Sequence, residues 1–276
     1  MDESLPRLEI LPVANMVVHE WHDEQRTPPL IARFQQSGVC RNPPIVTSLQ
    51  DESQRFMVLD GANRITAFQQ MGIPHSVVQV VEADDAGLKL YNWNHVIWGW
   101  ESSELLTILA QLSDINLVTS EGGMPDLVRD SGLAMMQTAQ GDLYTIYTSV
   151  EVFEQRVAIL NAIVDSYKDR AKIDRTNEWS VVRLKAIYPD LCGLMIFPHF
   201  EIHQILSLVA KGCLLPAGIT RFMISPRVLH LNYPIDEMAA EKTLEEKNAT
   251  LQRFIQERIA EKGVRYYAEA TYLFDE

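Results

Sequence analysis

The segment that most constrains the fold is residues 55–82, which pass from strand to helix across one glycine and return to a strand. RFMVLD (55–60) is a short apolar run typical of a strand. Over residues 61–71, apolar side chains recur at helical spacing, and Gly72 marks the end of that helix. HSVVQVVE (75–82) predicts the next strand. The chain must therefore combine helices and strands in one unit.

The residues before this unit extend it toward the N-terminus. RLEILPVANMVV (7–18) predicts a short strand, a turn and a second apolar piece, and the polar residues 19–30 predict a loop. A short helix is expected over 28–38, because prolines suit a first turn and a glycine ends it. PIVTSL (44–49) predicts a strand. We expect an N-terminal domain over residues 1–83.

The remainder predicts a larger mixed α/β domain over residues 84–276, with the boundary placed at the polar residues 82–87. The expected elements are a helical region (84–112), β-rich stretches (143–153 and 195–200), a helix (201–212), a strand broken by Pro226 (221–233), a long amphipathic helix (237–263) and a final strand (264–274). The predicted class is therefore α+β, with two domains.

Charge and composition exclude several function classes. The formal net charge of −13 and the absence of a basic run argue against DNA as the main partner. No apolar run approaches the roughly 18–20 residues that span a bilayer, and the acidic start lacks the pattern of a signal peptide. Three scattered cysteines suit a reducing compartment. We expect a cytoplasmic protein with no membrane partner.

The strongest chemical signal is VLDGANRITAF (58–68). Gly61 allows backbone to approach a ligand closely, the helix that follows offers N–H groups and a favourable dipole to phosphate, and Arg64 adds donors. Asp60 is a candidate magnesium ligand or proton acceptor. The structural alternative is that Asp60 caps the helix and Arg64 pairs with a surface carboxylate. A Walker phosphate loop is absent from the sequence.

Two further patterns carry weaker signals. His199 and His203 lie four residues apart beside Glu201, a spacing that can bind zinc on a helix, although Pro198 puts the first histidine at the helix edge. SEGGMPD (120–126) is a glycine-containing acidic loop that suggests a lid.

Residues 55–81 resemble the ParB/sulfiredoxin-like superfamily, whose hallmark is a strand, DGxHR, a helix and another strand. This chain has Asn63 where the superfamily has histidine; Asn63 can hydrogen-bond but cannot titrate. Ala62 stands where sulfiredoxins carry their cysteine, so the reductase activity is not expected. No basic helix-turn-helix region of the kind found in chromosome-partitioning proteins follows residue 83.

A closer resemblance, in outline over the whole chain, is to the free serine kinases, including the siderophore-biosynthesis type. His19-Glu20 lies in the loop where those kinases carry a catalytic glutamate. Trp93-Asn94-His95 lies where they carry an aromatic residue of the serine pocket, and LPAGITRF (215–222) resembles the segment that closes over their site.

The resemblance implies a role for each residue. Glu20 would be the base, and Asp60 the magnesium ligand or a second proton acceptor. The phosphoryl group and nucleotide would be held by Gly61, Ala62, Asn63, Arg64, Thr220 and Arg221, and the serine by His19, Trp93 and His95. The implied ligands are ATP or ADP, Mg²⁺ and free L-serine.

Each of these residues also has a structural interpretation. Glu20 could be a solvated loop carboxylate beside Asp23 and Glu24, and Trp93 could serve packing alone. His95 could be a buried structural histidine, and Arg221 could pair with the acidic residues 237–246.

The alternative to a kinase is a regulatory protein that keeps the nucleotide-binding fold without catalysis, since Asn63 replaces the histidine of the superfamily. The residues do not distinguish ATP from ADP as donor, or serine from a related hydroxy amino acid. A homodimer is compatible with the sequence.

Overall fold

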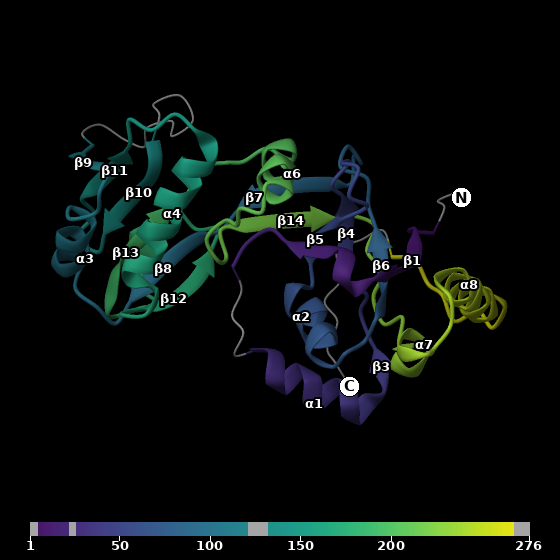
Figure 1. The fold of residues 1–276 in the computed structure, drawn as a ribbon. Helices are drawn as coiled ribbons and strands as arrows, with labels where there is room; N and C mark the ends of the chain where they lie inside the picture. The colour runs from purple at the N-terminus through teal and green to yellow at the C-terminus, as the bar shows by residue number, and fades with distance from the viewer. Residues whose placement is uncertain (1–4, 22–25, 121–131, 268–276) are drawn as a thin grey trace.

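The computed structural model describes residues 5–21, 26–120 and 132–267. Its first sheet contains five strands in the order β1-β6-β4-β5-β2 and lies on the right in Figure 1. β1–β6 and β4–β5 pair antiparallel, whereas β4–β6 and β2–β5 pair parallel. The bounds are β1 Leu8–Pro12, β2 Met16–Val18, β4 Ile45–Ser48, β5 Phe56–Asp60 and β6 His75–Val80, with a 3₁₀ turn η1 Val13–Asn15 between the first two. The strands predicted over 44–49, 55–60 and 75–82 are confirmed.

Two helices pack below this sheet in Figure 1, α1 Thr27–Ser37 and α2 Ala62–Gln70. α1 begins with prolines in its first turn and ends at Gly38, whose φ of 67° is left-handed. The rings of Phe34 and Phe68 stack between the two helices, with centroids 4.9 Å apart. Both helices were predicted to within two residues.

The second sheet, on the left in Figure 1, has six strands in the antiparallel order β12-β8-β13-β10-β11-β9. Its strands are β8 Asn94–Trp98, β9 Asn116–Thr119, β10 Gly132–Thr138, β11 Leu143–Tyr147, β12 Lys172–Thr176 and β13 Leu191–Ile196. The helices near it are α3 Ser102–Leu109, α4 Phe153–Lys168, α5 Val181–Lys185 and α6 Ile202–Ala210. Side chains of α3, α4 and α6 share one buried cluster with this sheet.

The helical expectation for residues 84–112 is wrong for most of its length. Residues 88–98 form β7 Leu88–Asn92 and β8, and α3 alone is helical. Buried and exposed residues alternate along β7, which is the period of a strand. β7 pairs antiparallel with β14 Thr220–Ile224, and this two-stranded ribbon lies between the two sheets in Figure 1.

The C-terminal part of the chain returns to the first sheet. β15 Tyr233–Pro234 pairs with β3 Val39–Cys40, and α7 Ile235–Ala239 and α8 Leu244–Ala260 follow. The single helix expected over 237–263 is interrupted because Ala240 is extended and Thr243 caps a new helix through a capping box with Glu246.

Asn248 of α8 hydrogen-bonds the backbone N–H and carbonyl of Ile10 in β1, at 2.9 and 3.0 Å. Tyr233, Met238 and Leu251 belong to the buried cluster of the first sheet. The division into 1–83 and 84–276 stays a prediction, and these contacts join the end of the chain to its beginning. Of the strand expected over 264–274, residues 264–267 are irregular and the rest lie outside the described residues.

Within the described ranges, no helix is both long and apolar enough to cross a bilayer.

Candidate functional site

The turn between β5 and α2 brings backbone, carboxylate and guanidinium together. Gly61 has φ +100°, a left-handed conformation that disfavours other residues. A Cβ atom at Gly61 would also lie 2.6 Å from Nη2 of Arg64, because that side chain lies across the glycine. The backbone therefore favours glycine here, and a side chain at this position would displace the Arg64 guanidinium. The first N–H groups of α2 have no partner within the helix, which suits an anion.

Two arginines hold Asp60. Arg64 Nη2 lies 2.8 Å from Asp60 Oδ2, and Arg227 contacts the same oxygen. Burial acts to raise the pKa of Asp60, but the charges of Arg64 and Arg227 outweigh it and leave the pKa below its ordinary value. Asp60 is thus anionic at neutral pH and a weak base, which suits a cation ligand better than a proton acceptor.

Two buried polar atoms at this turn lack partners within the described part of the chain: Asn63 Oδ1 and Arg64 Nε. Buried polar atoms are seldom left unpaired in native proteins. Both atoms belong to the DGANR segment: a phosphate oxygen would satisfy the Arg64 N–H, whereas Asn63 Oδ1 needs a donor or a cation.

His19 and Glu20 follow β2 and lie against residues 215–220. Glu20 bridges Leu215, and the Leu215 N–H donates to the His19 carbonyl at 2.9 Å. Glu20 Oε2 lies 2.9 Å from Thr220 Oγ1 and 3.3 Å from the N–H nitrogens of Ile219 and Thr220. Two predicted motifs, almost two hundred residues apart, therefore meet at one carboxylate.

Trp93 lies between β7 and β8, and its backbone N–H donates to the Ile219 carbonyl at 2.9 Å. The Arg221 guanidinium stacks over the Trp93 ring, 4.4 Å from its centroid. Arg221 is therefore held over Trp93 by a cation–π contact.

One cavity of about 840 Å³ collects these groups. It is lined by His19, Glu20, all of Asp60–Arg64, Trp93, Thr220 and Arg221. Of the predicted site residues, His95 alone does not line it. His95 is buried behind the cleft, between the Tyr167 hydroxyl at 2.8 Å and the Gly218 carbonyl at 3.2 Å, and burial lowers its pKa to about 4. A neutral, buried ring with both nitrogens bonded has a structural role rather than a ligand contact.

The sequence interpretation missed four arginines that line the same cavity: Arg26, Arg33, Arg175 and Arg227. With Arg64 and Arg221 they make six, against the carboxylates of Glu20 and Asp60. Arg26 and Arg33 are seven residues apart at α1, a one-face spacing that was a usable signal. Arg175 and Arg227 reach the cleft only through the tertiary fold. A strongly positive cleft in a chain of net charge −13 is suited to a phosphate-bearing ligand.

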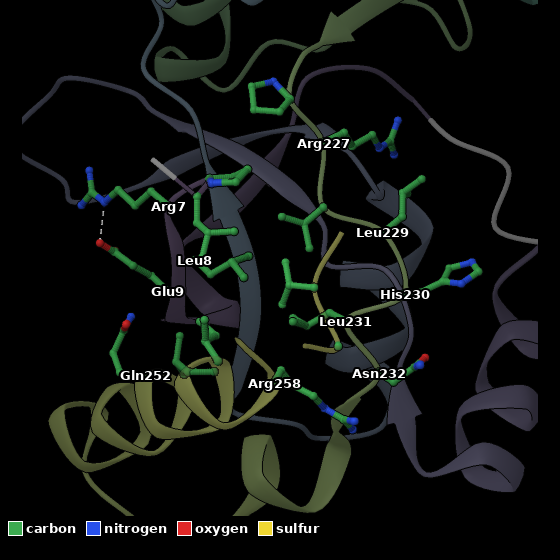
Figure 2. Close-up of a pocket in the computed structure, with 18 of the residues that line it drawn as sticks. Arg7, Leu8, Glu9, Arg227, Leu229, His230, Leu231, Asn232, Gln252 and Arg258 are labelled. Carbon is green, nitrogen blue, oxygen red and sulfur yellow. Dashed lines mark hydrogen bonds and ion pairs between the residues drawn. The ribbon is translucent and has the colours of Figure 1, made fainter. Parts of the chain in front are cut away.

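Another cavity, about 980 Å³, lies elsewhere, between β1, residues 226–232 and α8. Figure 2 shows Leu8, Leu229 and Leu231 around it, with Arg227 on the segment that also borders the first cavity. None of the predicted site residues lines it.

The zinc interpretation of residues 199–203 is not supported. Glu201 is the N-cap of α6 and is engaged in a capping box with Gln204, so His199 lies before the helix. The described residues hold no group of three or more histidine, cysteine or acidic side chains placed for a metal ion. The proposed lid at 120–126 lies almost wholly outside the described residues.

The chain is similar to known proteins over its whole length. No family model matches the chain. A curated relative, the ATP-dependent L-serine kinase SbnI of Staphylococcus aureus, is 24% identical over 284 residues. The alignment covers 100% of this chain and 100% of that relative.

Solved structures show the same fold. SbnI of Staphylococcus aureus with a C-terminal truncation gives a TM-score of 0.74 at 22% identity, covering 91% of this chain and 97% of that one. A free serine kinase variant in complex with AMP gives 0.70 at 13% identity, covering 85% and 95%. A variant in complex with ADP gives 0.69 at 13% identity, covering 86% and 95%.

Fold and cleft together define the class of the molecule: a mixed α+β protein with an arginine-lined cleft over the start of a helix. Within that class, the full-length sequence match and the structural matches show that this chain is similar to the free serine kinases, SbnI among them.

Proposed function

We propose that the protein is a kinase that transfers a phosphoryl group from ATP or ADP to the hydroxyl of free L-serine, giving O-phospho-L-serine. The observation that carries the proposal is the meeting, in one cavity, of Glu20 with the Asp60–Arg64 turn. The name of the SbnI relative supports both the reaction and the amino acid.

The phosphate end of the cleft is the Asp60–Arg64 turn. The N-terminus of α2, the Arg64 guanidinium and the side-chain NH₂ group of Asn63 supply donors for phosphate oxygens. Arg227, paired with Asp60 in this structure, adds a further charge at the same place. Phosphoryl transfer depends chiefly on such positioning and charge stabilisation.

Glu20 supplies the base. Its carboxylate is mostly buried and faces the same cavity as the phosphate turn. As the serine Oγ attacks, its proton passes to Glu20, a bond forms between Oγ and the terminal phosphorus, and the bond from that phosphorus to its bridging oxygen breaks. The electron pair leaves with the nucleotide, which departs as ADP from ATP or as AMP from ADP.

Trp93, Arg221 and Thr220 border the serine end. The Arg221 guanidinium, fixed over Trp93, is placed to meet a carboxylate, and the indole closes one wall around a small substrate. His19 contacts the Thr220 hydroxyl and takes part through it.

Asp60 fits Mg²⁺ as a single carboxylate ligand, with nucleotide phosphate oxygens and water completing the shell that this ion prefers. Its lowered pKa keeps it ionised for that role. Bound there, the ion would neutralise phosphate charge. Arg227 and Arg64 both contact Asp60 Oδ2 in this structure. With Mg²⁺ bound to Asp60, one of the two arginines would bind the phosphates instead.

The direct test is incubation of the purified protein with L-serine and either ATP or ADP, with phosphoserine followed by ³¹P NMR. L-threonine in a parallel series tests the amino acid. Formation of phosphoserine with one nucleotide is expected. If the protein binds nucleotide but forms no phosphoserine from either donor, it is a nucleotide-sensing regulatory protein rather than a kinase. Asn63 favours that alternative, because it stands where the superfamily has a titratable histidine.

A further inference from the structure

His19 is among the most buried polar groups at the cleft, and both of its ring nitrogens are bonded. Nδ1 lies 2.7 Å from the Val58 carbonyl oxygen in β5, and Nε2 lies 2.7 Å from Thr220 Oγ1 in β14. The residue is 6% exposed and the ring meets Phe222 edge-on, with centroids 5.1 Å apart. Both polar atoms of the ring are therefore already engaged within the protein.

Thr220 links this histidine to the base. Its hydroxyl oxygen lies 2.7 Å from His19 Nε2 and 2.9 Å from Glu20 Oε2, and Thr220 is itself buried. Histidine, threonine and glutamate thus form one chain of short contacts. The direct separation between His19 Nε2 and Glu20 Oε2 is 4.0 Å, too long for a hydrogen bond.

The hydrogens in this chain can be counted. The Val58 carbonyl can only accept, so Nδ1 of His19 carries a proton. When His19 is neutral, Nε2 is an acceptor and must receive the single hydroxyl hydrogen of Thr220. Glu20 then keeps only the more distant backbone N–H groups of Ile219 and Thr220. When His19 is protonated, Nε2 donates to Thr220, and the hydroxyl hydrogen turns to Glu20.

We infer that His19 and Thr220 are positioning residues that set the hydrogen bonding of Glu20, rather than contacts to serine or phosphate. Neutral His19 withdraws the Thr220 hydrogen from the carboxylate and leaves Glu20 the stronger proton acceptor. Protonated His19 returns that hydrogen and weakens the base. The inference rests on the proposed kinase function and assigns a pH control to the same site.

Charged groups in the same cavity as His19, Thr220 and Glu20 come from several elements. Glu20 lies on the same segment, Asp60 ends β5, Arg221 belongs to β14 and Arg175 to β12, and all of them line the same cavity. Thr220 is therefore the one neutral group between His19 and the carboxylate, and substituting it changes the relay without changing the charge of the site.

The kinetic test compares pH profiles of kcat for the wild type, Thr220→Val and Thr220→Ser between pH 5.5 and 8.5. The wild-type rate should rise with pH, because only neutral His19 leaves Glu20 the stronger base. Thr220→Val should flatten this rise, because no hydroxyl hydrogen can turn to Glu20 at low pH, and Thr220→Ser, which keeps the hydroxyl, should restore the profile. Thr47→Val, another buried threonine, is the matched control and should keep the wild-type profile. An unchanged rise in Thr220→Val, with an effect on KM alone, would overturn the inference.

A second arm does not depend on turnover. ¹⁵N NMR of the imidazole groups at pH 8.5, with the His19 signals identified by their loss in His19→Gln, reports the tautomer. The hydrogen count requires the Nδ1–H form for neutral His19. The Nε2–H form would overturn the relay even in an active kinase. Conversely, the Nδ1–H form in a protein that makes no phosphoserine would locate the failure in the proposed function.

Discussion

At the residue scale, the site rests on side chains held by one another before any ligand is bound. Arg64 and Arg227 are both bound to Asp60, Arg221 stacks on Trp93, and Thr220 bridges His19 and Glu20. Prior fixing of this kind reduces the entropy that binding must overcome. It also means that single substitutions should affect ligands more than folding.

Arg64→Ala should weaken nucleotide binding or turnover at least tenfold while changing the free energy of unfolding by about 1 kcal/mol or less, since an accessible ion pair contributes little to stability. Isothermal calorimetry and urea denaturation measure the two effects. Arg55→Ala is a matched control, because Arg55 makes the same i,i+4 pair with Asp51 away from the cleft. Unchanged affinity and kinetics in Arg64→Ala would remove the phosphate-binding assignment.

Asn63 tests whether the histidine of the superfamily is needed as an acid or only as a donor. Asn63→Ala should lower kcat/KM, whereas Asn63→His should keep it, because both side chains can donate to phosphate. The measurement is phosphoserine formation across pH. A large gain of activity in Asn63→His, with a new dependence near pH 6.5, would indicate that the present protein is a sensor rather than a working kinase.

At the element scale, the strand–glycine–helix turn is where local sequence decided most. Gly61 and the start of α2 were predictable because a backbone that needs a positive φ and an apolar face at helical spacing are both local signals. The strand β7 was not predicted from the sequence. Its alternation of buried and exposed residues covers few positions, and these were interpreted together with the helix α3 that follows.

Gly61→Ala should separate backbone strain from the clash with Arg64. Gly72 also has a positive φ, of 69°, but a Cβ there meets nothing within 4 Å. Each substitution should destabilise by about 1 kcal/mol through the backbone. Gly61→Ala should in addition weaken nucleotide binding, because it displaces Arg64. Equal nucleotide affinities for the two variants would contradict this account of the turn.

At the scale of the whole molecule, the cleft is assembled from both ends of the chain. Its arginines come from α1, α2, β12, β14 and the residue 227 segment. The sequence placed Glu20, Asp60 and Thr220 in candidate motifs through resemblance, but it could not show that they meet, since that depends on long-range pairing. Arg175 and Arg227 carried no local signal at all. The helix α4 carried a local signal, because its buried side chains recur at helical spacing, but the sequence interpretation missed it.

The second sheet should lose stability in acid through His95. Burial lowers its pKa to about 4, against about 6.5 when unfolded, so the unfolded chain binds the proton first and stability falls as pH drops from about 6.5 to 4. The loss should be roughly 3 kcal/mol. Urea denaturation at several pH values measures it. His95→Gln should be less stable at pH 7 but flatter in pH, and the exposed His199→Gln should keep the wild-type slope; a wild-type slope in His95→Gln would be contrary to this assignment.

In the proposed reaction, Glu20 accepts the proton of serine, and nucleotide binding in the cleft does not depend on Glu20. The most direct measurement is the turnover of Glu20→Gln at saturating serine and nucleotide, with nucleotide affinity determined on the same sample. Loss of a base typically lowers turnover about 10²–10⁴-fold. We expect that loss with nucleotide affinity within about threefold of the wild type, since the Asp60–Arg64 turn is untouched. A kcat near that of the wild type would contradict the claim.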